Sequence, residues 1–301
     1  MGKRSTSPCP CLYVANTGSN TVTVYPIGAT GNVAPIQTIG GSNTGLIDPT
    51  DVGLDASGNI YVANVNGEFN DSVTVYAAGS NGNVSPIRTI AGSNTTMNYI
   101  IGVALDSSEN VYVTNGPGGP SGQGAITIYA AGATGNVAPV NTITGSNTGL
   151  DVPYRLALDT SNNIYVPNFN NQTITVYAAG ATGNVAPIQT IGGHRTRLYD
   201  NEQVAVGGGS IYTAGPACDC VTSFPVGAHG NVAPSLRIQG RKTKLSSPAD
   251  VAVDASGNVY VVNGGPTITV YAPGIGGNVA PIRTIKGART KLNSPGGIAI
   301  Q

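Results

Sequence analysis

The residues best suited to chemistry in this sequence are cationic side chains in its last third. Residues 1–192 contain four Lys or Arg and nine Asp or Glu, a balance of −5, whereas residues 193–301 contain ten and five, a balance of +5. Three short runs, here called the basic segments, hold most of this excess: His194-Arg195-Thr196-Arg197-Leu198, Arg241-Lys242-Thr243-Lys244-Leu245 and Ala288-Arg289-Thr290-Lys291-Leu292. Clustered cations attract anions even when the net charge is zero, so the basic segments indicate an anion-binding surface. The alternative is a set of solvated loops that keeps a charge-poor protein in solution.

A nucleic acid is one possible polyanionic partner of the basic segments. Proteins that bind single strands usually add aromatic side chains on which the bases stack. Tyr199 is the only clear candidate for stacking near these segments. Nucleic acid is therefore a possible but not a favoured partner.

Cysteine and histidine give little support for catalysis or for a metal centre. The four cysteines form two Cys-x-Cys pairs, Cys9/Cys11 and Cys218/Cys220, which could be zinc ligands, independent thiols or two local disulfides. The pairs fall at different places in the repeat described below, which argues against a shared zinc ion. The two histidines, His194 and His229, suggest no Ser/His/Asp or Cys/His grouping.

An internal repeat defines the elements that must position these residues. The phrase Gly-Asn-Val-(Ala/Ser)-Pro occurs six times, starting at residues 31, 82, 135, 183, 230 and 277. Around each copy, short runs rich in Val, Ile, Thr and Tyr are bounded by Gly- and Asn-containing turns, which is the pattern of antiparallel strands. In the second unit the four strands are expected at residues 51–55, 60–64, 73–76 and 87–90.

The chain ends predict how these units are arranged. The sequence opens on a second strand of a unit, at residues 12–16, and closes on a lone first strand, at residues 298–300. Those two pieces complete one sheet, so we expect an all-β, six-bladed propeller of four-stranded antiparallel blades. Residues 1–11 are expected to be an N-terminal tail and residues 12–301 a single propeller. Tyrosines repeat at two fixed strand positions and are assigned to the packing between blades.

The predicted topology separates the loops into two faces. The hairpins within each unit, including the Gly-Asn-Val-Pro turns, are monotonous and are assigned to the scaffold on one face. The other face carries the second-to-third connections and the between-blade loops, which join the fourth strand of one unit to the first strand of the next. These loops vary, and variable loops on a rigid frame usually carry binding. The between-blade loops include the basic segments and three uncharged counterparts, here called the neutral segments, at residues 42–46, 93–97 and 146–150.

The sequence resembles the NHL-repeat family of six-bladed propellers and the wider gluconolactonase-like set. The resemblance spans residues 12–301 and is carried by the phrase Pro-x-x-Val-Ala-Val-Asp-x-Ser-Gly-Asn-Val-Tyr-Val-x-Asn at Pro248 to Asn263. It departs from the family pattern where Asn64 and Asn263 replace an Asp. The resemblance implies the fold, and it raises two activities found among such propellers, RNA binding and metal-dependent lactone hydrolysis.

The mouth of the central channel is the second candidate site. The position that begins each first strand holds Asp51, Gly102, Arg155, Gln203, Asp250 and Gly297 in successive units. Converging carboxylate and amide oxygens could hold a hard cation. The Asn that ends five of the six second strands is more simply a turn-capping residue, and Glu202 is the only Glu placed to join a lactonase-like site.

These observations favour a non-catalytic binding or scaffold propeller that holds a ligand or protein partner on the loop-bearing face. The alternatives are a polyanion- or RNA-binding propeller that uses residues 194–291 and a metal-dependent lactonase-like hydrolase. No cofactor or bound metal is expected, and the protein is expected to be a monomer. No apolar run approaches a membrane span, and no signal-peptide core follows Met1. The Asn-, Thr- and Gly-rich composition nevertheless favours a bacterial protein outside the cell or at its surface. The candidate binding residues are Asp51, Arg155, His194, Arg195, Arg197, Tyr199, Gln203, Arg241, Lys242, Lys244, Asp250, Arg289 and Lys291.

Overall fold

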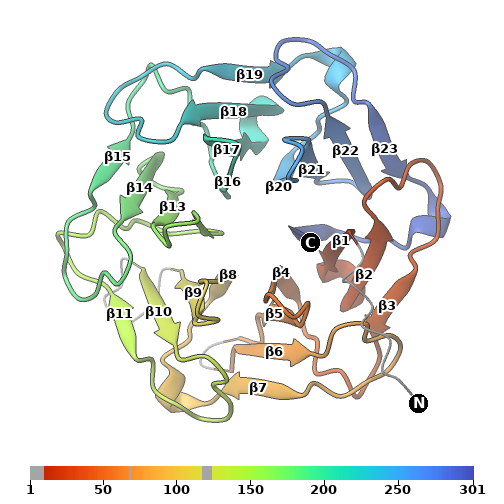
Figure 1. Cartoon of the computed structure of the whole chain (residues 1–301), viewed down its shortest axis with the longest axis vertical. Coiled ribbons are helices and arrows are strands. Elements are labelled where there is room, and N and C mark those ends of the chain that lie inside the picture. Colours follow the sequence, from red (N-terminus) through yellow and green to blue (C-terminus); the bar gives the residue numbers. More distant parts are fainter. Residues whose placement is uncertain (1–9, 68–69, 117–123) are drawn as a thin grey trace.

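Six four-stranded antiparallel sheets surround a central axis (Figure 1). The computed structural model describes residues 10–67, 70–116 and 124–301. In five of the blades the strands follow one another in chain order, whereas in blade 1 the C-terminal strand of the chain precedes the N-terminal strand; the strand named first for each blade lies nearest the axis. The predicted fold class and blade number are confirmed.

The strands of the first three blades follow the predicted order. Blade 1 contains β24 (Pro295–Ile300), β1 (Cys11–Asn16), β2 (Thr21–Pro26) and β3 (Gln37–Gly40). Blade 2 contains β4 (Pro49–Leu54), β5 (Ile60–Asn64), β6 (Ser72–Tyr76) and β7 (Arg88–Ala91). Blade 3 contains β8 (Ile100–Leu105), β9 (Val111–Asn115), β10 (Ala125–Tyr129) and β11 (Asn141–Ile143).

The last three blades repeat the arrangement, with shorter innermost strands in blades 4 and 5. Blade 4 contains β12 (Ala157–Leu158), β13 (Ile164–Asn168), β14 (Thr173–Tyr177) and β15 (Gln189–Ile191). Blade 5 contains β16 (Ala205–Gly207), β17 (Ser210–Gly215), β18 (Cys220–Pro225) and β19 (Leu236–Gln239). Blade 6 contains β20 (Pro248–Val253), β21 (Val259–Asn263), β22 (Thr267–Tyr271) and β23 (Arg283–Lys286).

Helix is confined, in the part of the chain that the structure describes, to five three-residue 3-10 turns. They are η1 (Thr17–Ser19), η2 (Ser93–Thr95), η3 (Pro216–Cys218), η4 (Arg241–Thr243) and η5 (Ala288–Thr290). Among the described residues, no helix is long and apolar enough to cross a membrane.

The C-terminal strand closes the ring, as predicted. β24 pairs antiparallel with β1 through Leu12 opposite Ile300, Tyr13 opposite Ala299 and Val14 opposite Ile298 (Figure 1). This pairing completes the sheet of blade 1 and closes the ring. Because β1 is paired on both sides, it is not left as an exposed edge strand.

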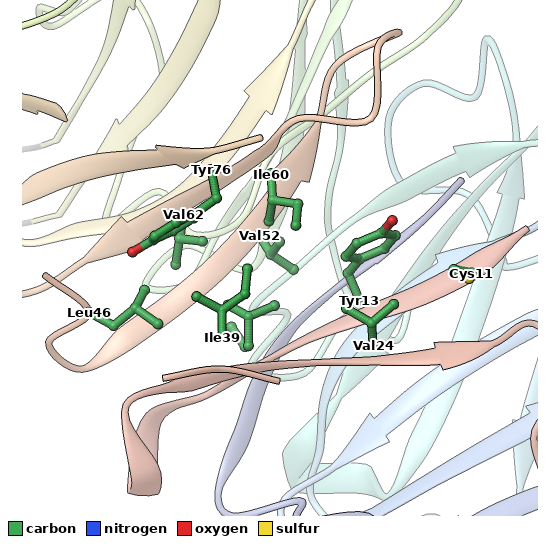
Figure 2. Close-up of a cluster of buried hydrophobic side chains, with 11 residues drawn as sticks. Cys11, Tyr13, Val24, Ile39, Leu46, Val52, Ile60, Val62 and Tyr76 are labelled. Atoms are coloured by element: carbon green, nitrogen blue, oxygen red, sulfur yellow. The ribbon is translucent and has the colours of Figure 1, made fainter. Parts of the chain in front are cut away.

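Apolar side chains fill the spaces between neighbouring blades. Figure 2 shows Ile39 of blade 1 beside Val52 of blade 2, in a buried cluster that also contains Val24 and Val62. The strand tyrosines belong to such clusters, and the expectation that they are core residues is confirmed. They are all buried: Tyr13, Tyr25, Tyr61, Tyr76, Tyr112, Tyr129, Tyr165, Tyr177, Tyr212, Tyr260 and Tyr271.

The Gly-Asn-Val-Pro turns reach further than the sequence predicted. Each was expected to be a hairpin confined to the scaffold face, but its glycine forms a parallel bridge to the outermost strand of the preceding blade, as Gly82 does with Ile39. The Asn83 side-chain oxygen then accepts a hydrogen bond from the backbone N–H of Asn43, at 2.7 Å, in the preceding between-blade loop. A Cβ on Gly41, which has a φ of +124°, would lie 2.6 Å from the Asn83 side chain. The turns are therefore clamps between blades.

Candidate functional site

A repeated set of hydrogen bonds fixes the backbone of the between-blade loops. In the neutral segment at residues 42–46, the Thr44 hydroxyl donates to the Gly41 carbonyl at 2.7 Å and accepts from the Leu46 N–H at 3.2 Å. The Tyr76 hydroxyl donates to the Thr44 carbonyl at 2.6 Å. The basic segment at residues 241–245 has the same bonds, made by Thr243 and Tyr271. The two kinds of segment therefore share one rigid frame.

The asparagine that ends five of the six second strands anchors the far side of the frame. In blade 6 the Asn263 side-chain oxygen accepts the Ser246 N–H at 3.0 Å, and its amide donates to the Thr269 hydroxyl at 3.3 Å. The equivalent residues make the same kind of contact and are almost fully buried: Asn16, Asn64, Asn115 and Asn168. Their capping role, predicted in preference to metal binding, is confirmed.

The cationic side chains of the basic segments project from this frame into solvent. His194, Arg195, Arg197, Arg241, Lys242, Lys244, Arg289 and Lys291 are all exposed. Arg195, Lys242 and Arg289 bind the frame only through the backbone N–H, which donates to Asn231, Asn278 or Asn32. Within the described ranges, none of the Arg or Lys side chains of the basic segments forms a hydrogen bond or an ion pair. These charges hold nothing together in the propeller.

Three of these cations occupy a backbone conformation that favours glycine. The fourth residue of each segment has a left-handed φ: two of the neutral segments place Gly45 (+70°) and Gly149 (+71°) there, and the third places Thr96 (+58°) there. The basic segments place there instead Arg197 (+55°), Lys244 (+60°) and Lys291 (+58°). A residue with a Cβ is strained in this region by about 1 kcal/mol. The basic segments therefore carry long cations at a position where the same frame accepts glycine or an uncharged Thr.

Each of three successive blades has a groove beside a between-blade loop. The blade 4 groove, of about 310 Å³, is lined by Gln172, His194, Arg197 and Tyr199 among others. The blade 5 groove, of about 320 Å³, includes Arg241. The blade 6 groove is lined by polar and cationic side chains and has a volume of about 480 Å³; its lining includes Lys244, Ser246, Thr267, Thr284 and Lys286.

Lys286 is one residue of this surface that the sequence analysis missed. It is exposed at the end of β23 and lines the same groove as Lys244. Its signal was present in the repeat, because the equivalent positions hold uncharged residues: Gly40, Ala91, Thr144, Gly192 and Gln239.

Blade 5 departs from the common frame next to Tyr199. Gly215 stands where the other blades have the capping asparagine, and a Cβ there would lie 2.8 Å from both the Tyr199 carbonyl and the Cys218 sulfur. Cys218 and Cys220 form a disulfide, so in this pair the local bridge is the alternative that the structure supports. Cys11 is disulfide-bonded as well, and Cys9 lies outside the described residues. The shared zinc site is excluded for the second pair.

A second cation that the sequence analysis missed lies beneath this region. Arg237 in β19 is half-buried, and its guanidinium donates to the Cys220 sulfur at 3.6 Å. Burial lowers the pKa of Arg237, and the positive charge of Arg197 lowers it further. The repulsion between these two cations shows that positive charge gathers at the blade 5 end of the surface.

Arg155 crosses the central channel. From the blade 4 side its guanidinium donates to the carbonyl of Thr50, at 3.0 and 3.2 Å, and to the carbonyl of Ala249, at 3.1 Å. A Cβ on Gly296 would lie 3.3 Å from the same guanidinium, so glycine leaves room for it. The structure thus brings Arg155 to residues of blades 2, 6 and 1 around the axis.

The two channel carboxylates bind the backbone of neighbouring blades. Asp51 accepts the N–H of Val52 at 2.8 Å and of Val103 in blade 3 at 2.9 Å. Asp250 accepts the N–H of Val251 at 2.7 Å and of Ile298 in blade 1 at 2.8 Å. Their exposed fractions are 5% and 4%, and burial raises the pKa of both groups, while Arg155 opposes the increase. These carboxylates act as ties between blades.

Gln203 is the fourth polar residue of the channel. Its side chain is completely buried, and neither amide atom has a hydrogen-bond partner among the described residues. The neighbouring first strands are close: a Cβ on Gly102 would lie 2.7 Å from the Arg155 Cα, and one on Gly297 would lie 2.5 Å from the Asp51 Cα. Glycine at these two positions leaves room for the backbone of Arg155 and Asp51 beside them.

The donor set of a metal-dependent hydrolase does not fit this channel. Asp51 and Asp250 already accept two backbone N–H groups each, and the Arg155 cation lies beside them. In the described ranges, no three His, Cys, Asp or Glu side chains are grouped so that they could hold a metal ion. His229 instead accepts the Thr190 N–H at 3.3 Å, as part of the contact between blades 4 and 5. We therefore derive no reaction through a metal.

Known proteins support the fold and nothing narrower. No protein-family model and no curated protein matches this chain. Solved structures do match it: a protein of unknown function from Bacteroides caccae has a TM-score of 0.66 and 11% identity, covering 98% of this chain and 99% of that one. A chain of a nidogen/laminin complex has a TM-score of 0.67 and 13% identity, covering 96% and 97%. The periplasmic gluconolactonase of Pseudomonas aeruginosa has a TM-score of 0.63 and 14% identity, covering 96% and 98%. At such identities the likeness extends to the propeller fold, and membership of the NHL-repeat family is not established.

Proposed function

We propose that this propeller is a non-catalytic binding module that holds an anionic partner on its loop-bearing face. The partner contacts the between-blade loops of blades 4 to 6 and 1. The binding residues are His194, Arg195, Arg197, Tyr199, Arg241, Lys242, Lys244, Arg289 and Lys291, with Lys286 added from the structure.

The observation that carries this proposal is the exposed, unpaired cation at the fourth residue of each basic segment. Arg197, Lys244 and Lys291 have left-handed backbones in which glycine is sterically preferred. Two neutral segments have glycine at this position and the third has Thr96, so the fold requires no cation there. Because these side chains are exposed and unpaired within the described structure, a ligand is the role left for them.

The disulfide of blade 5 supports the compartment that we propose. Structural disulfides persist in oxidising surroundings and are rare in the cytosol. Cys218 and Cys220 are bonded to each other, and none of the described cysteines is free. A location outside the cytosol is therefore part of the proposal, and titration of free thiols in protein purified without reductant tests it.

Removal of the cations tests the binding role. A variant in which seven residues become Ser is expected to lose retention on a sulfonate cation-exchange matrix at low salt, with a melting temperature close to that of the wild type; the seven are Arg195, Arg197, Arg241, Lys242, Lys244, Arg289 and Lys291. Equal retention of variant and wild type would contradict the proposal.

A second variant separates local charge from net charge. Lys is added to the seven-residue variant at four exposed hairpin serines of the opposite face: Ser57, Ser108, Ser161 and Ser256. These additions restore much of the lost charge without rebuilding the surface. If retention returns fully, net charge and not the basic segments governs binding.

A further inference from the structure

We infer that the anionic partner is an acidic polysaccharide, a flexible chain bearing sulfate or carboxylate groups that follows the arc of the basic segments. This inference rests on the proposed binding function and specifies its ligand class. The chain would place anionic groups at three successive between-blade loops and its sugar hydroxyls in the grooves beside them.

The surface lacks the apolar anchors that a folded protein partner needs. Energetically dominant residues at protein interfaces are mostly large aromatic side chains and arginines in desolvated central pockets. Among the exposed large hydrophobic residues that the structure describes, Tyr199 alone belongs to the candidate surface. Ile47 and Tyr99 lie in between-blade loops that carry neutral segments. The others lie outside the between-blade loops: Ile36, Ile87, Val140, Ile188, Val226 and Ile282.

The same composition argues against nucleic acid. Single strands are held by successive aromatic platforms, and Tyr199 offers one. Duplexes are stiff over roughly 150 base pairs. The basic segments instead follow β15, β19 and β23, which lie on successive sides of the ring (Figure 1). A straight duplex does not follow that curve, whereas a flexible saccharide chain does.

The grooves contain the side chains that bind sugars as well as anions. Arg197 lines its groove together with Gln172, and Lys244 lines its groove together with Ser246 and Thr267. Amide and hydroxyl groups form hydrogen bonds with sugar hydroxyls, and the neighbouring cation binds a sulfate or carboxylate. An acidic sugar presents both kinds of group within one residue.

The repetition of the site predicts a dependence on chain length. Equivalent loops on one rigid frame act as linked sites, so a chain that spans two or three loops gains affinity without a new kind of contact. Short oligosaccharides are expected to bind weakly, and affinity should rise with length until all three loops are occupied. The middle segment, residues 241–245, is essential for this gain because it links the other two.

The test measures binding by fluorescence anisotropy at one fixed ionic strength. The probes are size-fractionated heparin oligosaccharides, oligogalacturonates, poly(U) and poly-glutamate, with matched numbers of charges. We expect the saccharides to bind at least about tenfold more tightly than poly(U) or poly-glutamate, a difference of about 1.4 kcal/mol. The sulfated and carboxylated arms distinguish the two possible anionic groups.

A pair of variants links the effect to the middle loop. Lys242→Ser with Lys244→Gly converts two residues of the middle basic segment to uncharged types, and it should weaken long saccharides by about 100-fold while leaving the weak binding of short ones nearly unchanged. The matched control is Asn94→Ser with Thr96→Gly in a neutral segment, and it should bind like the wild type.

The outcomes separate this inference from the proposed function. Tighter binding of poly(U) or poly-glutamate, or equal binding of all four probes, would overturn the inference that the ligand is a polysaccharide. The proposed anion-binding function would still stand if the middle-loop variant weakens that binding. Saccharide affinity that does not change with chain length would also overturn it. If no probe binds, or if the middle-loop variant binds every probe like the wild type, both proposals fail.

Discussion

Charged residues occupy two regions of this propeller: a largely buried, hydrogen-bonded group at the channel mouth and an exposed group on the between-blade loops. At the channel mouth, Arg155 binds two backbone carbonyls, and the Asp51 and Asp250 carboxylates each accept two backbone N–H groups. In the basic segments, side chains such as Lys244 are exposed and make no such contact with the described structure. Charge at the channel therefore contributes to holding the ring together, whereas charge on the loops is available to a ligand.

Replacement of Arg155 by Met gives the largest effect that this comparison predicts. The change removes three hydrogen bonds and leaves two buried carboxylates without their counter-charge. Loss of one partner from a buried charge group typically destabilises by about 3–5 kcal/mol. We expect a decrease of that size in the free energy of unfolding, measured with urea, and unchanged binding to the heparin probe.

Arg241→Met is the matched control on the exposed surface. It removes the same guanidinium from a basic segment, where it has no structural partner in the described ranges. Its unfolding free energy should stay within about 0.5 kcal/mol of the wild type. Similar stability losses in the two variants would abolish the distinction between the regions.

The channel carboxylates predict a pH dependence of stability. Burial raises the pKa of Asp51 to about 6 and that of Asp250 to about 8, above the value of about 3.9 in the unfolded chain. Between these values the folded state keeps a proton that the unfolded state has lost, so stability falls as pH rises. Each group contributes a slope of at most about 1.4 kcal/mol per pH unit.

Asp250→Asn isolates this contribution. Asn does not titrate, so the variant should lose less stability than the wild type between pH 4 and pH 8. Its absolute stability will be lower, because the Asn side chain has a single accepting oxygen and can keep only one of the two N–H groups that Asp250 binds. The slope is therefore the diagnostic quantity, and parallel pH curves for the two proteins would refute the assignment.

The fold could be predicted from the sequence because several independent features of the repeat indicated the same architecture. The strand patterns, turn residues and the lone C-terminal strand all predicted six blades and their closure, and β24 pairs with β1 as expected. The contact of the Gly-Asn-Val-Pro turns with the preceding blade could not be predicted from the sequence. It depends on the distance between Gly41 and Asn83, which are far apart in sequence, and local turn chemistry does not encode that distance.

The candidate site was only partly accessible for the same reason. The basic segments could be found because they differ from the neutral segments at matched positions. The role of Arg155 could not, because it contacts Thr50 and Ala249 across the ring. The left-handed backbone of Lys244 also became visible only in three dimensions, although Gly45 and Gly149 at the equivalent positions were a usable sign.

The clamps test whether both kinds of loop share one frame. Asn83 holds the backbone of a neutral segment and Asn278 that of a basic one, through single hydrogen bonds of 2.7 and 2.8 Å. Replacement of either by Ala should lower the unfolding free energy by about 1 kcal/mol. Asn278→Ala alone should also weaken heparin binding, because Lys242 would no longer be held. Unequal stability losses would show that the frames differ.

The smallest predicted effect separates stability from binding most sharply. Lys244→Gly relieves a left-handed backbone at a φ of +60° but makes the unfolded chain more flexible, so stability should stay the same or rise by less than about 1 kcal/mol. Gly149→Lys, the reverse change, should lower stability by about 1 kcal/mol. The added Cβ would meet only ordinary contacts, so the cost is the strain of a left-handed backbone on a residue with a Cβ. Heparin binding should weaken in Lys244→Gly. A clear loss of stability in that variant would mean that Lys244 supports the fold, and the contrast between channel and loops would then break down.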